Sequence, residues 1–139
     1  MVLVNALKKG FQNGLRLTYE IAKVIVPIYI IIYFLEAIGL LERIASAVEP
    51  FMSLFGLPGE LSLALVVGNV LNIYAALGVI VAVGADAKEL TIISVMLLFS
   101  HSLPVELGIT KKTGVRVAWI AALRIGAAIA SGIMLNFIL

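Results

Sequence analysis

The side chains best suited to chemistry lie in one short stretch, Ser100-His101-Ser102, with Glu106 four residues further on. An imidazole between two hydroxyls and near a carboxylate can hydrogen-bond a polar solute, and imidazole titrates near physiological pH. The same groups could be drawn as a hydrolytic set, but catalytic sets are defined by their positions in space, and closeness in sequence is not such a geometry. We therefore predict a binding site and not an enzyme.

One cation lies deep inside an apolar segment. Arg124 is eight residues beyond Arg116, about 12 Å along a helix. A cation at that depth in a membrane costs about 2.5–3.5 kcal/mol on insertion scales, so it requires an acceptor. Glu106 is the first candidate, Glu60 the second, and the carbonyl ends of a broken helix would also serve. We predict that these three side chains form a charged gate or an ion-coupling group; the alternative is a pair that only stabilises the fold, or an arginine that snorkels.

The composition shows what kind of element must position these groups. Hydrophobic residues make up 63% of the 139 residues, charged residues 13%, and the mean hydropathy is +1.17. Ordinary globular domains are about half apolar and a quarter charged, so this chain is predicted to be an all-α membrane protein. Its length allows a single domain, 1–139. The net charge of +2 and scattered cations indicate no nucleic-acid surface, and no cysteine, metal or cofactor motif is present.

Four apolar segments are long enough to cross a bilayer, which takes about 20 helical residues. They cover 24–41, 61–85, 90–110 and 117–139. The third is interrupted by Pro104, which removes a backbone hydrogen bond and predicts two half-helices. Broken helices are tolerated in lipid where they are buried in protein or line a wet cavity, and transporters use such breaks as binding sites.

Two further segments are amphipathic. In 1–19, Leu3, Leu7 and Phe11 begin an apolar row that recurs every fourth residue beside several cations. This pattern is typical of a helix lying in the membrane interface, with 20–139 as the bundle, but the segment could equally extend the first crossing as one long helix. Residues 43–59 could form an interfacial helix or the descending arm of a re-entrant hairpin.

A short motif occurs twice. Residues 57–61 read Leu-Pro-Gly-Glu-Leu and residues 103–107 read Leu-Pro-Val-Glu-Leu. Each has the form of a helix start, with proline at the first helical position and a carboxylate facing the positive end of the helix dipole. Because two crossings separate the copies, we predict that both lie toward the same side of the membrane, with helix breaks at Pro58, Gly59 and Pro104. Two ordinary helix caps are the alternative.

Small and amide side chains recur at helical spacing within two of the crossings. Ala118, Ala122, Gly126 and Ala130 form one row, and Ala64, Gly68, Asn72 and Ala76 form another. Such rows let helix backbones approach closely in lipid, which is a structural role. Asn69 and Asn72 could face the same cavity as Ser100, His101 and Ser102, and these five residues are the predicted solute-binding set.

Taken together, these motifs resemble the nucleoside-recognition (Gate) domain family. The resemblance rests on Gly56-Leu57-Pro58-Gly59-Glu60, Gly68-Asn69, Asn72, Ser100 to Glu106, and Lys111-Lys112-Thr113-Gly114, and it extends from about residue 20 to the end. The family includes small membrane proteins, spore-maturation proteins and the membrane parts of ferrous-iron transporters. Those iron transporters carry a pore cysteine that this chain lacks, which argues against iron conduction.

The resemblance implies half of a transporter, because related carriers hold two such units in opposite orientation. With four crossings, the loops on one side carry Lys8, Lys9, Arg16, Lys23 and Lys88, and those on the other carry Arg43, Lys111, Lys112 and Arg116. Because the cations are divided almost equally between the two sides, we predict that the chain inserts in both orientations and forms an antiparallel homodimer. We expect a multi-pass plasma-membrane protein that moves a small, nucleoside-like polar solute; the alternative is a non-transporting scaffold of the spore-maturation type.

Overall fold

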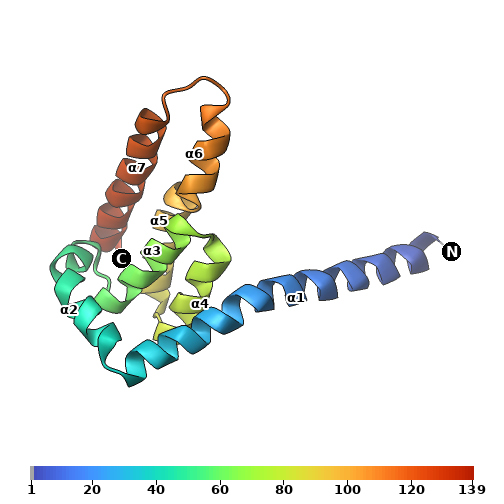
Figure 1. The fold of residues 1–139 in the computed structure, drawn as a ribbon, viewed down its shortest axis with the longest axis horizontal. Coiled ribbons are helices and arrows are strands. Elements are labelled where there is room, and N and C mark those ends of the chain that lie inside the picture. The colour runs from blue at the N-terminus through green and yellow to red at the C-terminus, as the bar shows by residue number, and fades with distance from the viewer. Residues whose placement is uncertain (1) are drawn as a thin grey trace.

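The computed structural model describes residues 2–139, and within that range the chain forms helices, turns and no strand. The helices in chain order are α1 (Val2–Ala37), α2 (Leu40–Met52), η1 (Ser53–Phe55), η2 (Gly59–Leu61), α3 (Ser62–Val70), α4 (Ile73–Val83), α5 (Ala87–Ser100), α6 (Leu103–Lys111) and α7 (Val117–Ile138). The prediction of an all-helical chain rich in apolar helices is confirmed. Figure 1 shows α3 to α7 as a bundle from which α1 extends to one side.

The N-terminal segment is part of one continuous helix. α1 runs from Val2 to Ala37 without a break at residue 19. Of the two alternatives, the structure therefore has one long helix and not a separate helix over 1–19. At 1.5 Å per residue its 36 residues extend about 54 Å, well beyond the hydrocarbon thickness of about 30 Å. Its second half packs on α4, where Gly78 lies beside Ile28, while residues 4–20 are exposed.

Gly39 ends α1 and turns the chain into α2. Its φ of 67° lies in the left-handed region that glycine adopts without steric cost, and the two helical segments meet at 89°. α2 is amphipathic: Leu41, Ala45 and Met52 are buried, and the opposite face carries exposed charges. Residues 43–59 therefore include a helix across the end of the bundle, followed by the turn at Gly56 that leads into η2.

The segment from 61 to 85 is a helical hairpin, and the prediction that it forms one straight crossing is wrong. α3 ends at Val70 and α4 begins at Ile73, separated by the non-helical Leu71 and Asn72. A Cβ built on Gly68 would lie 2.9 Å from the Cβ of Ala76, whereas eight residues of continuous helix would separate them by about 12 Å. Gly68 and Ala76, predicted to line one helix face, instead face each other across this hairpin, where they allow α3 and α4 to pack closely.

Two helices have the length and hydropathy of membrane spans: Ala87–Lys111, which combines α5 and α6, and Val117–Ile138. The bent pair α1–α2 would make a third. Each arm of the hairpin, Gly59–Val70 and Ile73–Val83, reaches only about half of a 30 Å hydrocarbon layer. The structure thus has two candidate spans, or three if the bent pair is one span, and a helical hairpin in the place of one predicted crossing.

Packing within the bundle follows from small residues on α7. Ala128, Ser131 and Gly132 are buried against α5, and a Cβ on Gly132 would come within 2.7 Å of the Met96 sulfur. The other predicted row, Ala118, Ala122, Gly126 and Ala130, faces outward and is exposed. One face of α7 is therefore a packing surface inside the chain, and the other has no partner among residues 2–139.

Candidate functional site

The spanning helix α5–α6 is interrupted at His101 and Ser102. His101 leaves the helical region with ψ 154°, and Ser102 takes a left-handed conformation with φ 52°, which a residue with a side chain rarely adopts. Pro104 follows at the second position of α6, where its missing N–H has no helical partner in any case. The helix break predicted from Pro104 is present, and its strained residue is the serine just before it.

Ser102 is held in this conformation by the tip of the hairpin. Its backbone N–H donates to the carbonyl of Gly68 at 2.9 Å, and its hydroxyl donates to the carbonyl of Leu71 at 3.3 Å. Both acceptors lie at the C-terminal end of α3, where helix carbonyls lack partners of their own. The break in the spanning helix and the turn of the hairpin are therefore fastened together, although about thirty residues separate them in sequence.

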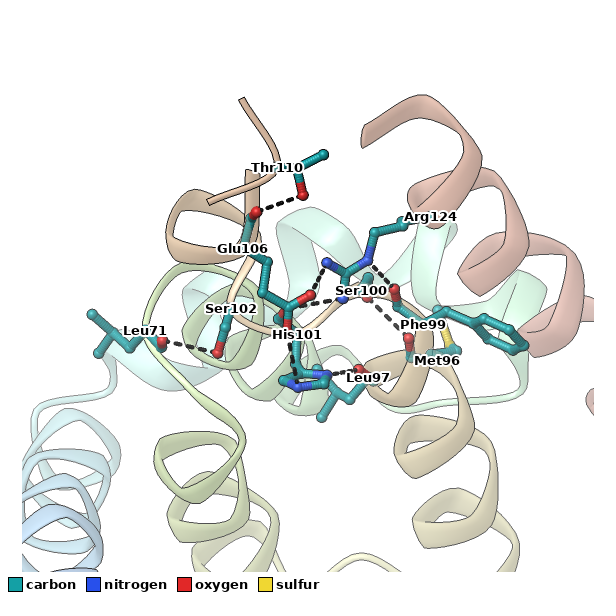
Figure 2. Close-up of polar contacts among 10 residues, drawn as sticks. All are labelled: Leu71, Met96, Leu97, Phe99, Ser100, His101, Ser102, Glu106, Thr110 and Arg124. Carbon is teal, nitrogen blue, oxygen red and sulfur yellow. Dashed lines mark hydrogen bonds and ion pairs between the residues drawn. The ribbon is translucent and has the colours of Figure 1, made fainter. Parts of the chain in front are cut away.

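Arg124 reaches this junction from α7, as Figure 2 shows. Its Nε donates to the carbonyl of Phe99 at 2.7 Å, and one terminal nitrogen donates to the carbonyl of His101 at 3.3 Å. Its other terminal nitrogen forms an ion pair with the carboxylate of Glu106. Both kinds of acceptor predicted for Arg124 are present, because the break frees carbonyls at the negative end of α5 while Glu106 lies in the first turn of α6.

His101 completes the cluster. Its Nδ1 lies 2.9 Å from the carbonyl of Leu97, and because a carbonyl can only accept, Nδ1 carries the hydrogen in this contact. Its Nε2 lies 3.4 Å from the second carboxylate oxygen of Glu106. The side chains of Arg124, His101 and Glu106 are 16%, 29% and 39% exposed, so the cluster is neither a dry core nor a free surface.

The remaining members of the predicted binding set have different surroundings. The Ser100 hydroxyl donates to the carbonyl of Met96 in its own helix, and Asn72 caps α4 by accepting from the N–H of Ala75. Asn69 differs, because its Oδ1 is buried and has no hydrogen-bond partner within residues 2–139. Neither serine hydroxyl bonds to His101 in that part of the chain, so the nucleophile–base contact of a hydrolase is not formed there.

Asn69 and Ser100 line a cavity of about 240 Å³ between α3, α5 and α7. Its other lining residues are apolar: Phe55, Leu65, Met96, Ile125, Ala128 and Ile129. A mostly apolar cavity with a few polar groups is the usual composition of a small-molecule site, although typical sites are larger, at about 300–1,000 Å³.

Glu60 is separated from this junction, and the predicted three-residue gate is not assembled. It lines a second cavity, of about 370 Å³, together with Glu36, Glu42 and Glu89. The hairpin explains this placement, since it returns Gly84 to the same end of the bundle as Pro58. The first copy of the repeated motif therefore lies at the end of the bundle, while the second lies beside Arg124.

Pro58 and Gly59 have a structural role in this placement. Pro58 precedes η2 in an extended conformation, and the backbone N–H of Gly59 donates to the carboxylate of Glu49 at 2.8 Å. A Cβ on Gly59 would lie 2.3 Å from the carbonyl oxygen of Ala45. Glu49 belongs to no motif and was not identified from the sequence. Nor did the sequence predict that the carboxylates around Glu60 lie together, although acidic residues flanking each apolar segment were a signal for this. No group of three or more His, Cys, Asp or Glu among the described residues has the geometry to hold a metal ion.

An all-helical bundle with apolar candidate spans, a helical hairpin and a charged helix break is the architecture of a membrane protein. The chain belongs to the Gate (nucleoside recognition) family, whose model matches residues 18–116. α7, which carries Arg124, lies outside the matched range. The chain is also similar to the uncharacterized membrane protein YvoD of Bacillus subtilis (strain 168), with 37% identity over 129 residues, which are 93% of this chain. The match spans only 41% of that protein's length. No solved structure matches the chain.

Proposed function

We propose that this chain is half of a carrier for a small polar solute of nucleoside-like character. The observation that carries the proposal is the hydrogen bond from the Ser102 N–H to the Gly68 carbonyl, which joins two interrupted backbone segments beside a deep cation. Interrupted backbone is tolerated at membrane depth where it is buried in protein or lines a cavity, and carriers place their substrate sites at such interruptions.

The cavity beside this junction has the chemistry to hold such a solute. Asn69 and Ser100 contribute an amide and a hydroxyl to the lining, and the apolar remainder suits the face of a planar ring. In this proposal Asn69 and Ser100 contact the solute inside the cavity, while His101 and Ser102 meet it at the neighbouring helix break. Asn72 supports the hairpin tip, and Glu106 and Arg124 form the gate. Glu60 is proposed to act only at the end of the bundle.

The small volume of the cavity is the reason to propose a homodimer. At about 240 Å³ it falls below the usual range for a site that encloses a small molecule, so a second copy would complete the enclosure. The outward row of Ala118, Ala122, Gly126 and Ala130 on α7 provides a surface for close helix contact between copies.

The hairpin changes the expected orientation of that dimer. It moves Lys88 to the end of the bundle that holds Arg43, and, if α1 crosses, it leaves the N-terminal cations on the side of the α6–α7 loop. With α1 as a crossing, the proposed arrangement puts two of the ten Lys and Arg on one side, Arg124 inside the bundle, and seven on the other side: Lys8, Lys9, Arg16, Lys23, Lys111, Lys112 and Arg116. This asymmetry favours one fixed orientation and a parallel dimer over the antiparallel one. Labelling of single cysteines placed in the α6–α7 loop tests this: labelling from both sides in cells would restore the antiparallel arrangement.

Uptake into proteoliposomes tests the transport role. We expect purified protein to accumulate at least one of a panel of labelled nucleosides and nucleobases. We expect Glu106→Gln and Arg124→Ala to lose about tenfold in rate, which corresponds to about 1.4 kcal/mol, because each removes one partner of the proposed gate. The control is Arg116→Ala, which removes an exposed cation outside the cluster. Unchanged uptake in both cluster variants would remove the roles given to Glu106 and Arg124.

A membrane scaffold is the second candidate function, favoured by the same outward row on α7. For a scaffold this row would be the working surface and the polar cluster a structural pair. Enlarging the row with Gly126→Leu, where a Cβ meets nothing within 4 Å, should then disrupt assembly without changing the fold of the monomer. Size-exclusion chromatography with light scattering reports the oligomer, and loss of assembly in a protein without uptake of any solute would favour the scaffold.

A further inference from the structure

Three oxygen groups converge on one point at the end of α5. They are the carbonyls of Phe99 and His101, which the helix break leaves without helical partners, and the carboxylate of Glu106. Together they carry one negative charge and the negative end of a helix dipole. Oxygen sets of this kind, made of unwound carbonyls and a carboxylate, bind monovalent cations in membrane proteins.

In this structure the guanidinium of Arg124 occupies that point. It uses Nε and both terminal nitrogens, one toward each of the three acceptors. The arginine is positioned by α7, whose Ala128 and Gly132 are buried against the rest of the bundle, and only 16% of its side chain is exposed. A cation is thus supplied by the chain itself and is held in place by helix packing.

We propose that Arg124 is a tethered substitute for a free inorganic cation, so that this oxygen cradle binds a monovalent cation only when the guanidinium is removed. The charges around the cradle support this. Within residues 2–139, the ionisable group that pairs with Glu106 besides Arg124 is His101, at 3.4 Å. Arg116 lies at the start of α7, about 12 Å from Arg124 along the helix. Loss of the guanidinium leaves a carboxylate at depth without its strong partner, which a small cation would stabilise.

The test measures thermal stability of purified protein in detergent, and it needs no transported solute. For Arg124→Ala we expect the Tm to rise by roughly 5 °C when choline is replaced by sodium, lithium or millimolar guanidinium at constant ionic strength, since a ligand that binds only the folded state raises its stability. We expect wild-type protein and Arg116→Ala to show no such difference. The double variant Arg124→Ala/Glu106→Gln should lose the rise, because the cradle has lost its charge.

Several results would overturn the proposal. Equal Tm of Arg124→Ala in choline and in every small cation would show that the cradle binds no cation. A sodium-dependent rise in the wild-type protein would show that a free cation binds beside the arginine. If Arg124→Ala does not fold, Arg124→Lys is measured instead. Its ammonium should occupy the cradle and keep the Tm independent of added ions. A Tm of Arg124→Lys that depends on added ions would contradict the proposal.

Cation binding by the cradle does not depend on the transport proposal. Only the expected effect of ions on uptake rests on that proposed function. If both hold, wild-type uptake proceeds equally in sodium and choline, and added guanidinium partly restores uptake to Arg124→Ala. A Tm effect without any uptake would support the cradle while removing the carrier.

Discussion

The two copies of the repeated motif, residues 57–61 and 103–107, have nearly the same sequence but different burial and different partners. In the first, Leu57 and Leu61 are buried, Gly59 packs against α2, and Glu60 lies in a cavity with three other carboxylates. In the second, residues 103–107 begin α6 inside a spanning helix, no residue of α6 is fully buried, and Glu106 pairs with Arg124.

The difference shows that the local sequence favours a helix start, whereas the neighbouring helix decides what the motif's side chains do. Proline and a following carboxylate favour a helix start in both copies, though at different positions: Pro58 precedes its short helix, whereas Pro104 is the second residue of α6. What each carboxylate does depends on the helix packed beside it. Matched substitutions in the two copies can test this contrast.

The largest contrast is expected at the last leucine of each motif. Leu61 has no exposed surface, so Leu61→Ala should lower the free energy of unfolding by about 2–4 kcal/mol through the cavity it leaves. Leu107 is only partly buried, and Leu107→Ala should cost less than half as much. Chemical denaturation in detergent measures both, and equal losses would mean that the two copies are packed alike.

The third position of the motif should show the next largest difference. Gly59→Ala places a Cβ 2.3 Å from a backbone oxygen of α2, which cannot move aside as a side chain tip can, and should cost about 1–3 kcal/mol. The matched Val105→Ala changes a side chain that is 59% exposed and should stay within about 0.5 kcal/mol. A tolerated alanine at residue 59 would show that η2 does not need this close approach.

The smallest contrast in stability, and the one that bears on function, is at the glutamates. Glu106→Gln should cost about 1 kcal/mol, a value reduced because the carboxylate is 39% exposed and because Arg124 keeps two carbonyl acceptors. Glu60→Gln should be neutral or slightly stabilising, since it removes one of four like charges around a cavity. Thermal unfolding of the two variants side by side measures the difference, and a larger loss for Glu60→Gln would reverse the assignment.

Much of this arrangement could be anticipated from residues alone. The apolar composition required helices in lipid, and the apolar run after Arg116 predicted a helix over 117–139 that the structure has at Val117–Ile138. Arg124, the one charge in that run, required an acceptor such as Glu106 because of its depth. The reason is energetic: lipid tolerates few unpaired backbone or charged groups, so composition and charge spacing constrain the outcome strongly.

The hairpin could not be anticipated in the same way. Residues 61–85 are long, apolar and uncharged, and no glycine or proline marks the turn at Leu71 and Asn72. Hydropathy reports that a segment belongs in lipid but carries no information on whether it crosses or turns back. The turn is stabilised by contacts remote in sequence, namely the Ser102 bonds to α3 and the close approach of Gly68 to Ala76.

By itself, then, the sequence determined that this protein belongs in lipid, that its third apolar segment breaks near Pro104, and that Arg124 needs an oxygen partner. These outcomes depend on local chemistry and on the cost of charge in lipid. Only the tertiary structure decided that one apolar segment folds back, which carboxylate meets the arginine and which is left among other carboxylates. Those outcomes depend on which helices pack together, and packing joins residues that no local pattern connects.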